Sequence, residues 1–221
     1  MSKNKKIVLG IFIVLVIVAF IITAIIITNE KNKNTQIEEI KEKEGISKLI
    51  SLKEKLEKTK NYSISLVLND ENSKVISRNG EQAKVEINDE GEKKTYLVKD
   101  DTTYLLIDKT KHYYEYKNTS SLLNDFINNI NDLEALKYEI GTENINGKDY
   151  KYEEFPGVNS FLINYKGNVD SVDSKTRMYF DGNDLKYIKT YVGDVEQLLK
   201  VEIKFNNQNN TSFEIPQEYS K

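Results

Sequence analysis

The sequence predicts an α+β protein, with an N-terminal transmembrane helix followed by an antiparallel β-sheet of about ten strands with covering helices. Three observations give this prediction. Residues 7–28 carry no charge. Short stretches with alternating apolar and polar residues recur between residues 61 and 205. Turn-forming pairs such as Asn79-Gly80 and Asn146-Gly147 separate these stretches.

The uncharged segment 7–28 is long enough to cross a membrane. At about 1.5 Å per residue it would form a helix of roughly 33 Å, against about 30 Å for a hydrocarbon core. Lys3, Lys5 and Lys6 precede it, so the positive-inside bias predicts a cytoplasmic N-terminus. A cleaved signal peptide is the alternative, but the apolar run is too long and no Ala-x-Ala site follows. We therefore expect an uncleaved signal-anchor.

This topology divides the chain into a cytoplasmic tail (1–6), the span (7–28), a polar stalk (29–45) and an extracytoplasmic domain (46–221). The residues after the span contain 29 of the 32 Lys and Arg and all 35 Asp and Glu. That acidic balance, with no stripe of basic residues, argues against a nucleic-acid partner. The chain has no Cys, so the domain must depend on its core rather than on disulfides.

The domain is expected to begin with an amphipathic helix of about 14 residues. Ile46, Leu49, Ile50, Leu52 and Leu56 fall near helical spacing. A helix lying on the membrane surface is the alternative. Because the apolar face lacks aromatic residues and the polar face is half Glu, we expect this helix to pack on a sheet.

The period then changes to two, which is typical of strands. The predicted strands of the first group are 62–68, 74–78, 83–87, 95–99, 102–108 and 111–117. Strands this close in sequence pair with their neighbours and form an antiparallel meander.

A second helix is predicted to interrupt the sheet. Thr119 or Ser120 can cap it, and its apolar stripe extends to Ile130. Strands resume at 136–141, and Asn146-Gly147 predicts a hairpin between this strand and residues 148–155. Further strands are expected at 160–165, 176–180, 184–191 and 198–205.

Three stretches in this order are informative together. They are GTENINGKDY from Gly141, RMYFDGNDLK from Arg177 and FEIPQEY from Phe213. Their pattern resembles the lipoprotein-carrier superfamily, which includes LolA/LolB-like carriers, LppX/LprG-like lipoproteins and related sporulation or germination lipoproteins. The resemblance covers residues 46–221 and implies a curved half-barrel closed by helices. A span stands here in place of the lipidated Cys of those lipoproteins.

A curved sheet that does not close leaves a concave apolar face that helices or a ligand must fill. We predict that this face is lined by Leu66, Leu68, Val85, Ile87, Leu97, Leu106, Tyr114, Leu122, Phe126, Ile130, Met178 and Phe180. The same residues could instead make an ordinary core, because every sheet with one buried face alternates in this way.

No enzyme, metal site or cofactor is predicted. His112 is the only histidine, no Gly-x-Ser-x-Gly or His-Glu-x-x-His motif is present, and the acidic turns lack the pattern of a calcium loop. The 14 tyrosines, several of them in the stretch 113–116, could form a partner-binding surface or simply occupy half-buried strand positions.

Two functions therefore stay open. The first is a membrane-anchored extracytoplasmic protein that holds a lipid, a lipidated protein or another apolar ligand in its half-barrel. The second is a non-catalytic accessory protein that docks on a cell-envelope or cell-wall enzyme, for example in sporulation or germination.

Overall fold

The computed structural model describes residues 47–117, 125–134, 136–157, 161–163, 173–206 and 212–221. The chain divides into two units, 1–45 and 46–221, and every described residue belongs to the second. The predicted tail, span and stalk lie outside the described residues. Within the described ranges, no helix is both long and apolar enough to cross a membrane.

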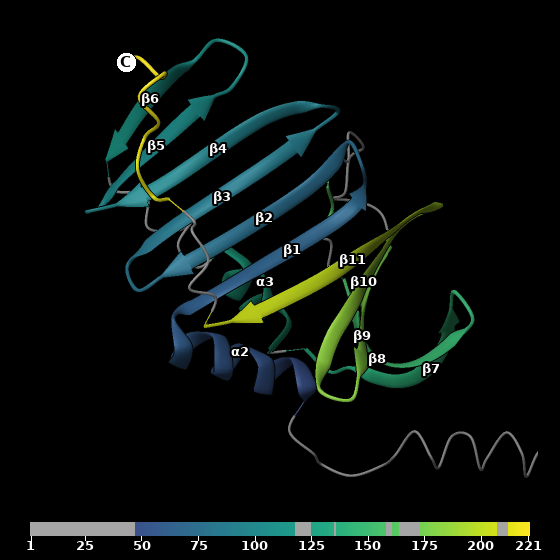
Figure 1. The fold of residues 1–221 in the computed structure, drawn as a ribbon. Helices are drawn as coiled ribbons and strands as arrows, with labels where there is room; N and C mark the ends of the chain where they lie inside the picture. The colour runs from purple at the N-terminus through teal and green to yellow at the C-terminus, as the bar shows by residue number, and fades with distance from the viewer. Residues whose placement is uncertain (1–46, 118–124, 135, 158–160, 164–172, 207–211) are drawn as a thin grey trace, which may run out of the picture. The chain divides into compact units, whose positions relative to one another are not determined.

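Eleven strands form one open antiparallel sheet (Figure 1), one more than the approximate number expected. They are β1 (Asn61–Asn69), β2 (Asn72–Asn79), β3 (Gln82–Asp89), β4 (Glu92–Lys99), β5 (Thr102–Ile107), β6 (His112–Lys117), β7 (Glu139–Ile145), β8 (Lys148–Pro156), β9 (Ser174–Asp181), β10 (Asp184–Val192) and β11 (Val195–Phe205). The order across the sheet is β6-β5-β4-β3-β2-β1-β11-β10-β9-β8-β7.

The sheet consists of two meanders joined at their centre. Strands β1 to β6 pair in sequence order, as do β7 to β11, which confirms the predicted meander. The pairing of β1 with β11 is the one contact in the sheet between strands distant in sequence. It places Ile64 opposite Ile203 and Leu66 opposite Val201.

Two helices lie on one side of the sheet. Helix α2 (Lys48–Thr59) buries Leu49, Leu52 and Leu56, so the first predicted helix packs on the sheet as expected. Helix α3 (Asp125–Glu134) interrupts the strand order between β6 and β7, and it continues beyond the predicted end at Ile130. Its predicted start and Leu122 lie outside the described residues.

The tight turns contain residue types that tolerate the backbone angles found there. At the β7–β8 hairpin, Asn146 has φ 53° and Gly147 has φ 83°, the left-handed values that a two-residue turn of this kind requires. Asp100 and Asp101 take the same region between β4 and β5, with φ 50° and 59°. Asp tolerates this region better than most residues because its short side chain bonds locally.

Two strand predictions need correction. Residues 161–163, predicted as part of a strand, form none, and Phe161 instead packs against Phe126 with 5.6 Å between the ring centroids. Strand β7 begins at Glu139 rather than at residue 136. The Leu136 N–H donates to the Leu133 carbonyl, so this residue still belongs to the turn that ends α3.

Candidate functional site

One row of apolar side chains crosses the first six strands of the sheet on the side of the helices. Cross-strand pairing places Ile64, Ile76, Val85, Tyr96, Leu105 and Tyr114 next to one another, one from each strand. We call these residues the apolar row. Its members belong to the face that α2 and α3 cover, which we call the helix-side face; the opposite side of the sheet is the outer face.

The helices cover only the first half of the apolar row. Ile64, Ile76 and Val85 are at most 1% exposed and belong to the hydrophobic core. Tyr96 is half-buried at the border of that core, whereas Tyr114 is 53% exposed. Tyr116, on the same face of β6, is 46% exposed. An aromatic surface therefore continues the core beyond the helices.

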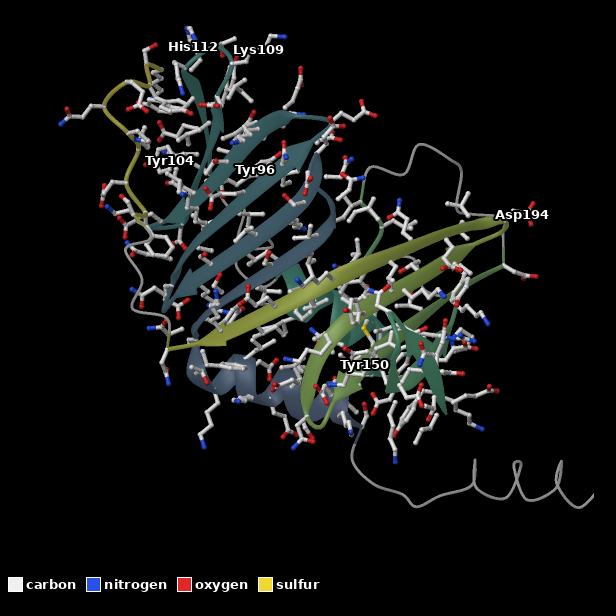
Figure 2. The ribbon with its side chains drawn as sticks, turned by 45° about the vertical axis from the view of Figure 1, so that its right-hand side comes forward. Tyr96, Tyr104, Lys109, His112, Tyr150 and Asp194 are labelled. Atoms are coloured by element: carbon white, nitrogen blue, oxygen red, sulfur yellow. The ribbon has the colours of Figure 1, made fainter. Side chains whose placement is uncertain are left out.

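We call the uncovered part of this face, formed by Tyr96, Leu105, Tyr114 and Tyr116, the tyrosine strip. It lies at the β6 end of the sheet. Figure 2 shows Tyr96 in that part of the molecule and Tyr150 at the other end.

The residues predicted to line an apolar cavity separate into three groups. The core contains Leu66, Val85, Phe126, Ile130, Met178 and Phe180, and Leu68 and Ile87 pack against its border. Tyr114 lies on the same face but is exposed. Leu97 and Leu106 lie on the outer face, because Leu97 pairs with Lys84 and Leu106 with Thr95, neighbours of Val85 and Tyr96 in their strands.

One pocket between the two helices is small. Between α2, α3 and Phe155 the described residues enclose about 20 Å³. A cavity of this size holds about one water molecule and has no room for an acyl chain. Whether the predicted residues bind any ligand stays a prediction.

The C-terminal segment, residues 212–221, crosses the outer face of the first meander (Figure 1). Leu97 and Leu106 are buried there, at 2% and 3% exposure. Together with Ile215, Pro216 and Tyr219 they line a groove of about 600 Å³. These two leucines are therefore buried on the outer face, not on the concave face where we predicted them.

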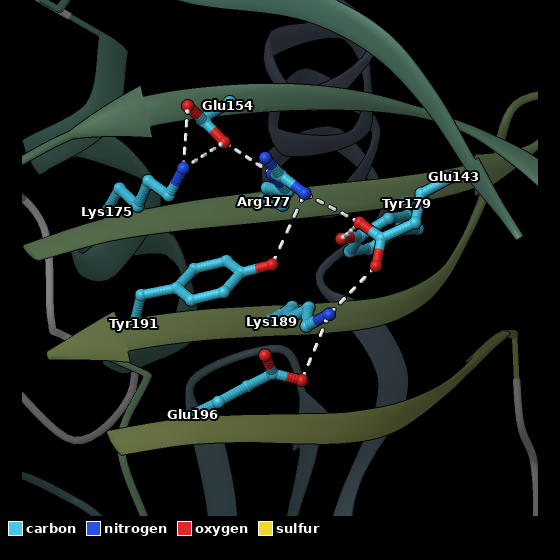
Figure 3. A network of polar contacts seen from close by, with 8 residues as sticks. All are labelled: Glu143, Glu154, Lys175, Arg177, Tyr179, Lys189, Tyr191 and Glu196. Atoms are coloured by element: carbon cyan, nitrogen blue, oxygen red, sulfur yellow. Dashed lines mark hydrogen bonds and ion pairs between the residues drawn. The ribbon is translucent and has the colours of Figure 1, made fainter. Parts of the chain in front are cut away.

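A polar network covers the outer face of the second meander (Figure 3). Glu143 of β7 accepts from Arg177 at 2.6 Å, from Tyr179 at 2.6 Å and from Lys189 at 2.8 Å. Arg177 also donates to Glu154, and Lys189 contacts Glu196 at 3.0 Å. One carboxylate thus joins the edge strand β7 to β9 and β10.

Aromatic rings enclose the cation of this network. The Arg177 guanidinium lies 4.5 Å from the centre of the Tyr152 ring and 5.3 Å from that of Tyr191. A Cβ on Gly141 would lie 2.3 Å from Tyr152 ring atoms, so only glycine lets this ring take its place. The network is structural in character, since each charge already has an opposite charge beside it.

The pKa of Glu143 reports the strength of these contacts. Burial by itself raises the pKa of this carboxyl, but hydrogen bonds from Lys189, Tyr179 and Arg177 outweigh burial and lower it to about 2. For Tyr179, burial and then the hydrogen bond to Glu143 raise the pKa. Both groups therefore keep one protonation state throughout the physiological range.

A second carboxylate fixes the start of α2. Glu153, 5% exposed and on β8, accepts from Ser47 Oγ at 2.7 Å and from the Lys48 N–H at 2.7 Å. A negative charge at a helix N-terminus satisfies free N–H groups and interacts favourably with the helix dipole. The first described residue of the domain is thereby tied to the second meander.

The described residues contain no group of three or more His, Cys, Asp or Glu side chains that could hold a metal ion. His112 lies on the exposed end of β6 near Lys109 (Figure 2), and its ring Nδ1 is 2.7 Å from the Thr110 carbonyl.

Sequence reasoning missed Tyr96 and Leu105 of the apolar row. Strand alternation could have found them, because residues two positions apart in a strand lie on the same face. The adjacent apolar residues at 97 and 106, however, left open which of the two faces is the core face. The polar network had no comparable signal, since its residues come from five strands. In comparisons with known proteins, the chain matches no family model and has no significant match among curated proteins.

Proposed function

We propose that residues 46–221 form a non-catalytic docking domain, a half-barrel held at the outer surface of a cell membrane by the segment 7–28. Its site is the tyrosine strip, and its partner is a protein of the cell envelope. The resemblance to lipoprotein carriers supports the half-barrel and the envelope location. The anchor follows from the uncharged segment and from the lysines before it.

The single observation that carries this proposal is the exposure along the apolar row. Its buried half serves the core, and its other half ends in Tyr114, 53% exposed, next to Tyr116, 46% exposed on the same face of β6. Tyrosine is enriched at protein interfaces because it combines a large apolar ring with a polar tip. Such residues, continuous with a packed core, form a rigid surface that binds with little loss of conformational freedom.

Binding of an apolar ligand is the second candidate. It is supported by the same resemblance, but the enclosed space of about 20 Å³ between α2 and α3 favours docking. Native mass spectrometry of the full chain, before and after delipidation, separates the two. A lipid bound in stoichiometric amount would favour the ligand-binding function.

A photo-crosslinking experiment tests docking. A benzophenone amino acid replaces Tyr114, Tyr116 or, as control, Asp194 in the exposed β10–β11 turn, and the variants are irradiated in membranes of the producing organism. We expect one protein to be crosslinked from positions 114 and 116 and not from 194. The same crosslinked products from all three positions, or none from 114 and 116 in a correctly folded chain, would contradict docking at the strip.

A further inference from the structure

The free edge of β6 already carries the beginning of an added strand. The Ser220 N–H donates to the Lys111 carbonyl at 2.9 Å, and the Tyr113 N–H donates to the Ser220 carbonyl at 2.9 Å. Ser220 and His112 form a parallel bridge. The C-terminal segment therefore pairs with the edge of the sheet and runs in the same direction as β6.

Further main-chain groups of β6 point toward the same side. Hydrogen-bonding groups alternate along a strand, so the N–H and C=O of Glu115 and Lys117 face outward together with those of Tyr113. Among the described residues, no main-chain group bonds to Glu115 or Lys117 on this side. The edge can therefore accept a longer strand than the two bonds of Ser220 use.

Side chains fix the position of the C-terminal segment. Glu214 contacts Lys99 at 2.7 Å, the Tyr219 hydroxyl donates to Asp108 at 3.0 Å, and Lys221 contacts Glu115 at 2.7 Å. The Lys111 ammonium also lies 5.0 Å from the centre of the Tyr219 ring. The site thus takes an acidic, an aromatic and a basic residue in that order, and this charge complementarity defines the chemistry of its occupant.

We propose that the β6 edge is a strand-addition site for a partner protein, and that residues 212–221 occupy it in cis as a resident competitor. The partner supplies an extended segment parallel to β6, with an aromatic residue and a Lys where Tyr219 and Lys221 lie. Two and four residues beyond the position of Ser220, its side chains face Tyr114 and Tyr116, so apolar residues fit there. The inference rests on the proposed docking function and names the main-chain contact that the partner uses.

Synthetic peptides test the edge directly. The probe is a fluorescent peptide with the sequence of residues 212–221, SFEIPQEYSK, titrated in detergent with chain 1–211 and with the full chain. We expect binding to chain 1–211 and at least tenfold weaker binding to the full chain, because a tethered segment competes at an effective concentration of about millimolar. Equal binding to both chains would overturn the proposal.

A matched peptide isolates the main-chain bonds. Ser220→Pro removes the N–H that bonds to Lys111, so this peptide should bind at least tenfold more weakly, whereas Ser220→Ala should bind as the parent does. Equal binding of the Pro and Ala peptides would overturn strand addition. If circular dichroism shows that chain 1–211 is unfolded, the full chain with Ser220→Pro takes its place, because it loses the bond to the Lys111 carbonyl without a deletion.

Extended peptides test whether the side chains of the added strand lie against Tyr114 and Tyr116 of the tyrosine strip. A peptide lengthened by Ile-Thr-Ile places both isoleucines opposite Tyr114 and Tyr116, and one lengthened by Thr-Ile-Thr places its isoleucine on the outer face. We expect the first to bind about tenfold more tightly, and equal affinity would overturn this assignment. Peptide binding without crosslinking at position 114 overturns the docking function and retains the edge site. Crosslinking at position 114 without peptide binding overturns the edge site and retains the docking function.

Discussion

The two meanders of this sheet have the same strand connections but differ in how their faces are covered. In the second, β7 to β11, the helix-side face is closed by α2 and α3 and the outer face by the network around Glu143 and Arg177. In the first, β1 to β6, the core ends at about Tyr96, and the last strand, β6, exposes Tyr114 and Tyr116 on the helix-side face.

Under the proposed docking function, this difference separates stability from recognition within one continuous sheet. Residues at the closed end have their partners inside the domain, so changes there should lower the free energy of unfolding. Tyr114 and Tyr116 at the open end are exposed, so changes to them should affect binding and leave stability nearly unchanged.

The largest effect is expected in a comparison of the buried part of the apolar row with its exposed part. Ile76→Ala removes a side chain that is 1% exposed and should lower the free energy of unfolding by about 2–5 kcal/mol, through lost burial and the cavity left behind. Tyr114→Ala, in the same row, should change it by less than about 0.5 kcal/mol. Urea unfolding of the full chain in detergent, followed by tyrosine fluorescence, measures both. Similar losses for the two variants would show that the tyrosine strip belongs to the core.

The next largest effect is that of acid on the closed meander. The pKa of Glu143 is lowered to about 2 in the folded protein from an ordinary value of 4.5. Its contribution to stability is therefore complete above pH 4.5 and is lost as the pH falls toward 2. The loss is roughly 3 kcal/mol at most, because each pKa unit corresponds to about 1.4 kcal/mol.

Urea unfolding at a series of pH values measures this loss, and Glu143→Gln should flatten the curve in that range. Glu202→Gln is the matched control, because Glu202 is exposed at 61% and pairs only with its strand neighbour Lys204. A curve for Glu143→Gln as steep as that of the parent would assign the acid sensitivity to other carboxylates, of which Glu154 has a pKa lowered by Arg177 and Lys175 despite burial.

A smaller effect is expected where α2 meets the second meander. Glu153→Gln removes the charge that accepts from Ser47 and Lys48 and should cost about 1–2 kcal/mol. Hydrogen exchange should show faster opening of the first turn of α2, with β9 and β10 unaffected. Faster exchange throughout the sheet would mean that this contact supports the whole fold.

Local patterns predicted the elements of the fold well. Alternation in β1 placed Tyr62, Ile64 and Leu66 on one face, and all three are buried there. The pair Asn146-Gly147 predicted its hairpin because few residues adopt left-handed backbone angles readily. Two residues of the quoted hairpin motif acquire physical roles, Gly141 under the Tyr152 ring and Glu143 at the centre of the network.

Prediction failed where neighbouring residues are equally apolar or where partners are distant. Tyr96-Leu97 and Leu105-Leu106 satisfy either register, and a shift by one residue moves a side chain to the opposite face. The pairing of β1 with β11 joins residues more than a hundred positions apart, and no local pattern encodes it.

That central pairing has a consequence for how the protein folds. Strand β1 is synthesised early, but its partner β11 ends at Phe205. The β1 edge of the first meander therefore stays unpaired until most of the chain has been synthesised. Closing so long a loop costs conformational entropy, so the pairing of β1 with β11 forms slowly. The waiting edge consists of NYSISLVLN, an uncharged stretch of the kind that pairs with other chains. Yield in a refolding reaction should therefore decline with protein concentration, and a chaperone that covers this edge should restore it.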